Sequence, residues 1–467
     1  MAGIFKEVNK RIHFIGIGGI GMSGIASLAL CRGLKVSGSD LKESKVTEEL
    51  RRQGATVAIG HSPRNIQGAD LAIYSSAIRE DNPEMLEAVA RGIPVIKRAQ
   101  ALAELMQGET VITVAGSHGK TTTTSLVSFL LLEAGLSPTV AIGGIFKNIN
   151  SNVCAGKGGF FVAEADESDG SFLYYEPRYS IVTNIDREHL DYYKDFQSEI
   201  EAFKEFINRT QGQGCVFACA DDPNLKRILG GYQKRYILFG LGQEADIYPQ
   251  NIRMKGLTCE FDCYYRIPHL GREHHFLDKF YLALGGRHNI SNALAVIGIG
   301  MELGIDLKII KQAFAQYQGA ARRLEIKFEG QDILILDDYA HHPTEIKATL
   351  AAARNLNFKR MVVIFQPHRY TRTKLLLDEF SRSFELADCL ILTDIYSASE
   401  PPIEGISGES LYNKIKECWP EKSIYFLPKE EISDFIIKDK QPQDLIITLG
   451  AGDIVRVGDE LVERLKR

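Results

Sequence analysis

Short apolar runs, each followed by a polar or glycine-rich turn and then by a helical stretch, recur along the whole chain. In the first part, such runs predict five strands: RIHFIGIGG, LKVSGSD, ATVAIGH, LAIYSSA and IPVIKRA. Regular alternation of strands and helices is typical of parallel sheets. We therefore expect a small doubly wound α/β domain that ends near residue 107.

The same pattern starts again twice. A second series of strands is predicted at TVITVAG, GFFVAEAD and YSIVTNID, with alternating strands over 250–284 and a closing helix at HNISNALAVIGIGMELG. A third series is predicted at DILILDDYA, MVVIFQPH, CLILTDIY, SIYFLP and LIITLGAGD. Helices are expected between these strands, over PTEIKATLAAARN and KLLLDEFSRSFELA, and Pro343 suits a first helical turn.

Composition narrows the class of protein. Acidic residues outnumber basic ones by 60 to 55, without blocks of like charge, so a nucleic-acid or anionic-membrane surface is not expected and small-molecule substrates are favoured. No apolar run reaches the roughly 18 residues of a membrane span, and MAGIFKEVNKR lacks the apolar core of a signal peptide. We expect a cytoplasmic protein.

The eight cysteines raise the question of a metal site or disulfides, since Cys215 and Cys219, and Cys259 and Cys263, lie four residues apart. In LTCEFDCYYRI, however, the cysteines share the apolar positions of an alternating strand. We expect buried, reduced thiols in a core.

GSHGKTT follows the apolar run VITVA and precedes a helical stretch, which is the context of a phosphate-binding loop. Backbone N–H groups and a helix N-terminus would hold phosphate oxygens, Lys120 would neutralise them and the Thr121 hydroxyl would bind Mg²⁺. Val114 occupies the place of the usual first glycine, and Gly116 gives a tighter loop. The alternative is a chance strand-turn-helix junction.

Acidic and histidine residues follow the next two predicted strands. VAEADESD places Glu164 where a carboxylate could hold the metal of a Mg-nucleotide, although such a cluster could also be a solvated turn. NIDREHLD offers His189, either as a metal ligand or as a loop histidine.

A second glycine-rich turn lies near the N-terminus. Gly16, Gly18 and Gly21 complete G-x-G-x-x-G after RIHFI, and Asp40 follows the second strand, where an acid would take a ribose hydroxyl. Alone, this pattern favours NAD, or a tight turn without a ligand. UDP-sugars also carry a pyrophosphate and a ribose, and an ATP-dependent enzyme acting on such a substrate accounts for both loops.

The sequence thus predicts an α/β protein with three domains, in agreement with its length of 467 residues. We expect a Rossmann-like domain over 1–107 and a P-loop ATPase-like domain with extra antiparallel strands over 108–318. GAARR marks the start of a Rossmann-like domain over 319–467.

The chain also resembles the Mur ligase family. The resemblance is carried, in this order, by GIGGIGMSGIA, SGSD, YSSAI, GSHGKTTTT, EADESDGSF, TNIDREHLDYY, GRHNISNAL, DDYAHHPTE and FQPHRYTRT. It is strongest with the branch that joins L-alanine to the lactyl carboxylate of UDP-N-acetylmuramate with ATP and Mg²⁺. The resemblance implies domains for the UDP-substrate, ATP and the amino acid, in that order, and an acyl-phosphate intermediate.

The resemblance also implies site residues. Lys120, Glu164 and His189 would be catalytic, and Thr121, Glu164 and His189 would serve the metal. ATP would be bound by Gly116, Ser117, His118, Gly119, Lys120, Thr121, Thr122, Asn289, Asn292, Arg323 and Asp338. From the residues alone, the two asparagines could equally be a helix cap and a polar face.

The UDP-substrate would be bound by Gly16, Gly18, Gly21, Ser23, Asp40, His61, Ser75 and Ser76. The amino acid would be bound by His342, His368, Arg369 and Arg372, since an arginine fork suits a free α-carboxylate; the alternative is a basic surface loop.

The chain departs from the family pattern at two points. The carbamylated lysine of later family members has no counterpart, and Glu188 replaces a common aspartate.

Three alternatives remain at this stage. A sister enzyme attaches a whole recycled peptide to the same UDP-sugar, and HRYTRT favours the free-alanine enzyme over it. An NAD-dependent oxidoreductase and an inactive nucleotide-binding regulator are the others.

Overall fold

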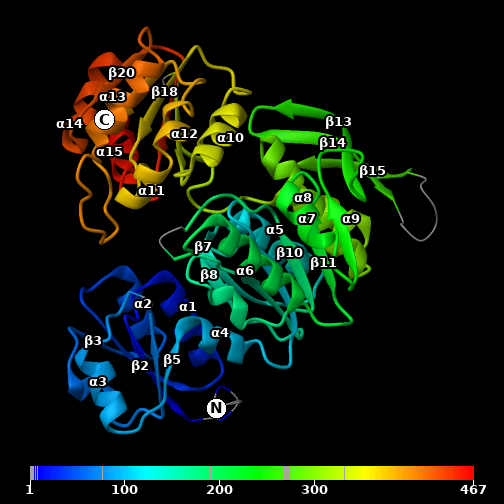
Figure 1. Cartoon of the computed structure of the whole chain (residues 1–467), viewed down its shortest axis with the longest axis vertical. Coiled ribbons are helices and arrows are strands. Elements are labelled where there is room, and N and C mark those ends of the chain that lie inside the picture. The colour runs from blue at the N-terminus through cyan, green and yellow to red at the C-terminus, as the bar shows by residue number, and fades with distance from the viewer. Residues whose placement is uncertain are drawn as a thin grey trace. The chain divides into compact units, whose positions relative to one another are not determined.

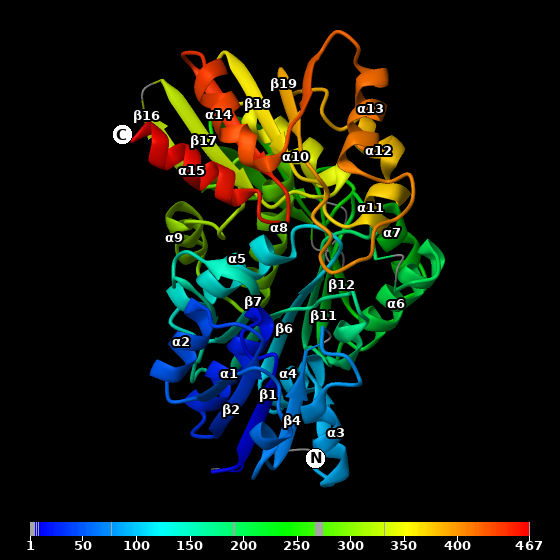
Figure 2. The same ribbon diagram turned by 90° about the vertical axis from the view of Figure 1, so that its left-hand side faces the viewer.

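The computed structural model describes residues 5, 7, 9–75, 77–189, 192–266, 274–330 and 332–466 (Figures 1 and 2). The chain divides into two compact units. The first unit consists of Met1–Arg187, Asp195–Ile247 and Ala295–Ala313, and the second consists of Glu188–Lys194, Tyr248–Leu294 and Phe314–Arg467. The strands form three sheets of five, ten and six strands, each with helices, so the architecture is three-domain α/β as expected. In the described part of the chain, no helix combines the length and the apolar character that crossing a bilayer requires.

The first sheet is parallel throughout, in the order β3-β2-β1-β4-β5. Its strands are β1 (Arg11–Ile15), β2 (Lys35–Asp40), β3 (Thr56–Ile59), β4 (Leu71–Tyr74) and β5 (Val95–Lys97), as predicted. Its helices are α1 (Ile20–Cys31), α2 (Lys45–Arg52), α3 (Pro83–Ala90) and α4 (Arg98–Leu105), with a 3₁₀ turn, η2 (Pro63–Ile66). Since parallel strands end at one edge, the turns that follow β1, β2 and β3 lie together there.

Local sequence explains where α3 begins. The Asn82 side chain accepts hydrogen bonds from the backbone N–H groups of Glu84 and Met85, and Pro83 stands at the first helical position. Asparagine at the N-cap and proline directly after it are both preferred at helix starts. This start places Glu84 in the first turn.

The strands of the second sheet that belong to the first unit run in the order β12-β11-β10-β6-β9-β7-β8. They are β6 (Thr110–Ala115), β7 (Thr139–Phe146), β8 (Ser151–Cys154), β9 (Phe160–Glu164), β10 (Tyr179–Val182), β11 (Cys215–Cys219) and β12 (Tyr236–Phe239). All pairs are parallel except β7 with β8. The helices are α5 (Lys120–Glu133), α6 (Phe196–Asn208) and α7 (Pro223–Leu229), with the 3₁₀ turn η3 (Ser171–Tyr174).

The chain continues through β13 (Ile247–Lys255), β14 (Thr258–Arg266), β15 (His274–Leu282), α8 (Arg287–Glu302) and α9 (Leu307–Gln316). β14 and β15 are antiparallel, which confirms the extra antiparallel strands. Cys215, Cys219, Cys259 and Cys263 are all buried thiols outside any disulfide, and the alternation in LTCEFDCYYRI predicted this for Cys259 and Cys263.

The third sheet has the order β16-β17-β21-β18-β19-β20, and only β16 is antiparallel to its neighbour. Its strands are β16 (Glu325–Gly330), β17 (Ile333–Asp338), β18 (Arg360–Phe365), β19 (Cys389–Leu392), β20 (Ser423–Phe426) and β21 (Asp444–Leu449). Its helices are α10 (Pro343–Ala353), α11 (Tyr370–Leu375), α12 (Leu377–Ser381), α13 (Gly408–Cys418), α14 (Lys429–Asp439) and α15 (Val455–Leu465).

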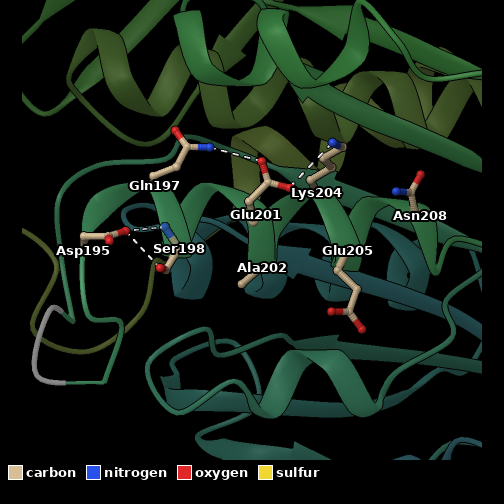
Figure 3. Close-up of a pocket in the computed structure, with 8 residues that line it drawn as sticks. All are labelled: Asp195, Gln197, Ser198, Glu201, Ala202, Lys204, Glu205 and Asn208. Atoms are coloured by element: carbon tan, nitrogen blue, oxygen red, sulfur yellow. Dashed lines mark hydrogen bonds and ion pairs between the residues drawn. The ribbon is translucent and has the colours of Figure 1, made fainter.

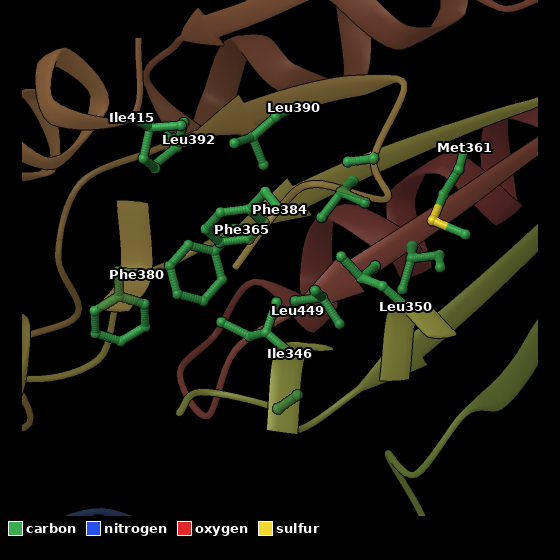
Figure 4. Packing of buried hydrophobic residues seen from close by; sticks show 14 of the residues in the cluster. Ile346, Leu350, Met361, Phe365, Phe380, Phe384, Leu390, Leu392, Ile415 and Leu449 are labelled. Atoms are coloured by element: carbon green, nitrogen blue, oxygen red, sulfur yellow. The ribbon is translucent and has the colours of Figure 1, made fainter. Parts of the chain in front are cut away.

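A cluster of buried hydrophobic side chains, which includes three phenylalanines, packs on one side of the third sheet (Figure 4). The Phe365 ring lies 5.7 Å from that of Phe380 and 5.1 Å from that of Phe384, measured between centroids, and all three are fully buried. Aromatic pairs at such distances stabilise a core beyond the area that they bury. This core holds in place the strands whose carboxyl ends carry the predicted third-domain residues.

The expectation of one helix over KLLLDEFSRSFELA is partly wrong. Helix α11 ends at Leu375, Leu376 leaves the helical conformation with φ −115° and ψ 24°, and α12 ends at Ser381. The Ser381 and Ser383 hydroxyls donate to the backbone carbonyls of Asp378 and Glu379. Such local bonds compete with helical ones, which explains the early end at Ser381.

Candidate active site

The phosphate loop lies between β6 and α5. Gly116 has φ 129° and Gly119 has φ 83°, a region that glycine enters without strain. A Cβ on Gly116 would lie 2.1 Å from Thr183 Oγ1, so only glycine fits there. The loop is held by Asn184, whose carbonyl oxygen accepts from Ser117 N at 3.1 Å and whose Oδ1 accepts from His118 N at 2.9 Å. The strand end after β10 therefore fixes the loop.

Lys120, the first residue of α5, is folded back over this loop. Its Nζ donates to the carbonyl oxygens of Gly116 at 2.7 Å and Ser117 at 3.2 Å, and to Glu167 Oε1 at 2.7 Å. Burial would lower the pKa of Lys120, but the surrounding carboxylates, Glu167 first, outweigh it and raise this pKa. The ammonium is thus charged and lies against the loop that would take a phosphate.

Thr121 and Glu164 lie beside the lysine. Thr121 Oγ1 lies 3.1 Å and 3.2 Å from the two carboxylate oxygens of Glu164, and Gly143 N donates to Glu164 Oε2 at 2.8 Å. Burial raises the pKa of Glu164, while Lys120 and the Gly143 N–H oppose the rise. A hydroxyl and a carboxylate are the hard oxygen donors that Mg²⁺ prefers, so these two residues fit a magnesium site.

Other residues of the loop have structural partners. His118 Nε2 lies 3.0 Å from Asp186 Oδ2, and the Ser117 hydroxyl accepts from Asp186 N at 2.8 Å. Thr122 is buried in the first turn of α5. The structure therefore brings the loop residues Gly116 to Thr122 together with Glu164.

His189 lies in the segment Glu188–Lys194, which belongs to the second unit. Its φ is 53°, and its Nε2 lies 3.4 Å from Glu188 Oε2. Glu188 also pairs with Arg372, whose Nε lies 3.4 Å from Glu188 Oε1. The predicted histidine is thus accompanied by a buried carboxylate that the sequence analysis noted only as a departure from the family pattern.

The predicted nucleotide residues of the second unit form two groups. Asn292 Nδ2 donates to Asn289 Oδ1 at 3.3 Å, and Asn289 Nδ2 donates to the Gly285 carbonyl at 2.7 Å. Asp338 accepts from Leu324 N at 2.7 Å and from Ala340 N at 2.8 Å. The asparagines therefore serve the start of α8, and Asp338 serves the turn that follows β17.

Arg323 lies near Asp338. Burial raises the pKa of Asp338 to about 6, and Arg323 opposes this rise. The Arg323 guanidinium lies over the Tyr339 ring, 5.3 Å from its centroid, and 3.7 Å from Glu345. These contacts hold the guanidinium beside the carboxyl end of β17.

His368 and Arg372 come together at the start of α11. Arg372 NH1 lies 3.1 Å from His368 Nδ1 and donates to the His368 carbonyl at 3.2 Å. The His368 ring stacks on Tyr396 with centroids 5.6 Å apart, and burial together with nearby positive groups lowers the pKa of His368 to about 3. Arg369 has φ 70° and lies 3.8 Å from Glu400.

His342 has a different role from its neighbour His341. His342 caps α10, where its Nδ1 accepts from Thr344 N at 3.3 Å. His341, which the sequence analysis missed, lies with its ring centroid 5.7 Å from that of His368, and its Nδ1 lies 3.2 Å from Glu345. A residue directly before a proline at the first helical position is a capping candidate, and this signal could have separated the two histidines.

The N-terminal glycine turn is held by the end of β2. Gly16 N and Ile17 N both donate to the Ser39 carbonyl at 2.9 Å, and Gly18 N donates to Asp40 Oδ2 at 2.8 Å. Asp40, expected at a ribose hydroxyl, thus anchors the glycine turn through one carboxylate oxygen. A Cβ on Gly18 would lie 2.8 Å from that oxygen, so a larger residue there would displace the Asp40 carboxylate.

The remaining predicted residues of this site lie at the same edge of the first sheet or in α1. The Ser23 hydroxyl donates to the Ile20 carbonyl at 3.0 Å, and the Ser75 hydroxyl accepts from Ala77 N at 3.3 Å. His61 Nδ1 lies 3.0 Å from the Ser39 hydroxyl oxygen. Ser76 lies outside the described residues.

Arg98, the first residue of α4, was missed by the sequence analysis. Its guanidinium lies so close to the glycine turn that a Cβ on Gly21 would be 3.0 Å from Arg98 NH1. Arg98 follows the strand β5 directly, and this position at a strand end could have identified it. The glycine turn is therefore accompanied by a cation.

A separate hollow lies on α6 (Figure 3). It is lined by Asp195, Gln197, Ser198, Glu201, Ala202, Lys204, Glu205 and Asn208. Its side chains are mostly paired with one another, Gln197 with Glu201 at 3.1 Å and Lys204 with Glu201 at 3.6 Å. It contains none of the predicted site residues.

Comparison with known proteins gives consistent matches over nearly the whole chain. Residues 11–110 match the Mur ligase family catalytic domain, 114–300 the Mur ligase middle domain and 322–452 the Mur ligase glutamate ligase domain. The chain is 47% identical over 457 residues to the UDP-N-acetylmuramate--L-alanine ligase of Geotalea uraniireducens, covering 98% of each chain. It is also 47% identical over 460 residues to that of Desulforapulum autotrophicum, covering 98% of this chain and 99% of the relative.

Two solved structures are similar to this chain over nearly its whole length. The UDP-N-acetylmuramate-alanine ligase of Thermotoga maritima superimposes with a TM-score of 0.81 at 30% identity, covering 98% of this chain and 99% of the other. A murein peptide ligase of Psychrobacter arcticus gives a TM-score of 0.71 at 24% identity, covering 98% and 99%, and this likeness concerns the fold alone.

Proposed function

Because the chain belongs to the Mur ligase family, we propose that it joins L-alanine to the lactyl carboxylate of UDP-N-acetylmuramate, with conversion of ATP to ADP and phosphate. The reaction would serve peptidoglycan precursor synthesis. The observation that carries the proposal is the arrangement of Lys120, Thr121 and Glu164 around the phosphate loop. The relatives named above carry the same activity in their names.

The residues of the loop would offset the charge repulsion that opposes the proposed reaction. A carboxylate must approach the γ-phosphate, and both groups are negative. Lys120 and the N-terminus of α5 offer positive charge at this place, and preorganised charge of this kind stabilises the transferring phosphoryl oxygens. Lys120 is held by carbonyl oxygens and by Glu167, and its Nζ would exchange the carbonyl oxygens for phosphate oxygens when ATP binds.

Thr121 and Glu164, with His189 as a third residue, are proposed to hold Mg²⁺. The ion would supply Lewis-acid neutralisation of the phosphate oxygens. The Gly143 N–H keeps the Glu164 carboxylate oriented toward Thr121. Lys120, Glu164 and His189 form the proposed catalytic set.

The remaining assignments divide along the chain. Residues 1–107 would bind the UDP-substrate, 108–318 ATP and 319–467 the amino acid. Asn289, Asn292, Arg323 and Asp338 would contact the nucleotide. These domain boundaries remain predictions, as does the cytoplasmic location.

The amino acid is proposed to bind at His342, His368, Arg369 and Arg372. Arg372 is supported best, because its guanidinium is held by His368 on one side and by Glu188 on the other. Its Nε faces Glu188 and its NH1 faces His368, so the NH2 group would donate to the α-carboxylate. His342 is already engaged as a helix cap, which favours an orienting role for it.

The test is ADP release from the purified chain with ATP, Mg²⁺ and UDP-N-acetylmuramate while the acceptor is varied. We expect release with L-alanine and much less with a peptide. Release with the tripeptide of the recycled peptide but not with alanine would assign the chain to the sister activity. Reduction of NAD without any use of ATP would reject a ligase altogether.

A further inference from the structure

A buried carboxylate lies behind the proposed UDP-substrate site. Glu84, in the first turn of α3 (Figure 1), is fully buried, and the sequence analysis assigned it no role. Its Oε2 lies 3.1 Å from His13 Nε2 and accepts from the Ser39 hydroxyl at 2.6 Å. Its Oε1 accepts from Ser62 N at 3.1 Å and from Asn65 Nδ2 at 2.7 Å. Four groups from three other parts of the first domain therefore surround one carboxylate.

The charge of Glu84 follows from these contacts. Burial alone would raise its pKa, but the hydrogen bonds from His13, Ser39, Asn65 and the Ser62 N–H outweigh burial and lower the pKa of Glu84 to about 2. The side chain is therefore an ionised carboxylate at neutral pH. An ionised carboxylate only accepts hydrogen bonds, so each of the four partners must donate to it.

This requirement also fixes the hydrogen positions on the Ser39 hydroxyl and on the His61 ring. The Ser39 hydroxyl has a single hydrogen, and that hydrogen is donated to Glu84. The oxygen of Ser39 can then only accept from the His61 ring, whose Nδ1 lies 3.0 Å away. His61 Nδ1 must therefore carry a hydrogen, and the nearby Glu84 Oε1, at 3.6 Å, favours the same arrangement. In a neutral imidazole the second nitrogen, Nε2, is then a hydrogen-bond acceptor.

We propose that Glu84 is a positioning residue that holds His61 in the Nδ1–H form, so that His61 Nε2 accepts a hydrogen bond from the nucleotide part of the substrate. The inference rests on the proposed function, which places His61 in the UDP site. Asp40 is the last residue of β2, and His61 lies two residues after the end of β3, at the same edge of the parallel sheet. The group selected at Nε2 is a hydrogen-bond donor, either the uracil N3–H or a ribose hydroxyl. A phosphate oxygen, which only accepts, is not selected there.

The decisive variant is Glu84→Gln in the full chain. A glutamine amide brings two N–H donors to a place where all partners donate. Ser39 can relieve the conflict by accepting from the amide and donating to His61 Nδ1, and this moves the imidazole hydrogen to Nε2. Long-range ¹H–¹⁵N spectra of histidine-labelled protein distinguish the two tautomers, and a His61→Asn spectrum assigns the signals.

We expect the Nδ1–H form in the unchanged chain and the Nε2–H form in Glu84→Gln. The dissociation constant of UDP, measured by calorimetry, should rise about ten- to hundred-fold, the usual effect of losing a buried hydrogen bond at a polar site. The dissociation constant of ATP should not change. Glu87→Gln, on the same helix and paired with Arg91, is the matched control and should leave both the spectrum and UDP binding unchanged.

Three further ligands identify the donor. N3-methyl-UDP should bind the unchanged chain weakly if the uracil N3–H is the donor, and 2′-deoxy-UDP or 3′-deoxy-UDP should do so if it is a ribose hydroxyl. If all three bind as well as UDP, no donor on the nucleotide is used and the inference is wrong.

Other outcomes are equally clear. An Nε2–H or a doubly protonated His61 in the unchanged chain at pH 7.5 overturns the inference, and so does weaker UDP binding in Glu84→Gln without a change of tautomer. If Glu84→Gln does not fold, Ser39→Ala tests the same relay while Glu84 keeps its other partners, and His61 should then lose its fixed tautomer. The tautomer is read without any substrate, so a chain with the expected spectra but no ligase activity would reject the proposed function alone.

Discussion

Replacing Lys120 by alanine tests the phosphate loop most directly. The lysine side chain is 14% exposed and pairs at 2.7 Å with the fully buried Glu167. Removing one partner of a buried ion pair leaves an uncompensated charge, which costs about 3 to 5 kcal/mol of stability. Lys120→Ala alone could therefore lose activity merely by unfolding.

A second substitution separates the two effects. Glu167→Gln in the Lys120→Ala background removes the unpaired charge, so the free energy of unfolding should recover most of the loss. The catalytic loss should remain, because the positive charge at the transferring phosphoryl group is still missing. Removal of one such contact costs about 3 to 4 kcal/mol of transition-state stabilisation, which is a decrease of about 10² to 10³ in kcat.

The assay is initial-rate ADP release with saturating UDP-N-acetylmuramate and L-alanine, run beside urea unfolding of each variant. Glu167→Gln alone controls for changes at Glu167. If the folded double variant kept more than a tenth of the kcat of the Glu167→Gln control, Lys120 would not act on the phosphate and the assignment of the loop would fail.

Three further outcomes follow from the structure. Arg98 lies beside the glycine turn, and we expect it to bind the pyrophosphate of the substrate. Arg98→Ala should then raise the dissociation constant of UDP roughly tenfold or more and leave that of uridine, which has no pyrophosphate, unchanged. Arg91→Ala is the control, and equal losses for UDP and uridine would contradict this prediction. Phe365 is fully buried, so Phe365→Ala should lower the free energy of unfolding of the protein, measured in urea, by about 3 to 5 kcal/mol. Leu375 is half-exposed, and Leu375→Ala should lower it by less than about 1 kcal/mol. Burial, together with the nearby Arg372, lowers the pKa of His341 to about 4. Protonation of His341 therefore favours the unfolded chain, so its contribution to stability is complete above pH 6.5 and is lost as the pH falls from 6.5 to 4. At pH 5 this loss is roughly 2 kcal/mol, and His341→Asn should remove it from the pH dependence of urea unfolding; an unchanged pH dependence would show that His341 does not titrate in this way.

Local sequence was enough to predict most strands and the phosphate loop of this protein. The period of apolar residues depends only on which side chains face a core, so all strands of the first sheet and most strands of the other two could be predicted without coordinates. The strands β7, β8, β11, β12 and β16 were not predicted. Gly116 and Lys120 could be identified because a glycine-rich turn between a strand and a helix has few other uses. The buried cysteines followed from the same alternation, since Cys259 and Cys263 occupy apolar positions of β14.

The contacts between polar side chains from distant segments could be seen only in the folded chain. Glu84 and His61 are 23 positions apart in numbering, and nothing in their local sequence indicates that Ser39 joins them. The contacts of His341 with His368 and Glu345 were hidden for the same reason, whereas the helix cap made by His342 could be recognised from the proline that follows it. Backbone periodicity is a local property that the chain carries everywhere, whereas a buried polar network exists only when distant segments bring together donors and acceptors whose burial would otherwise be costly.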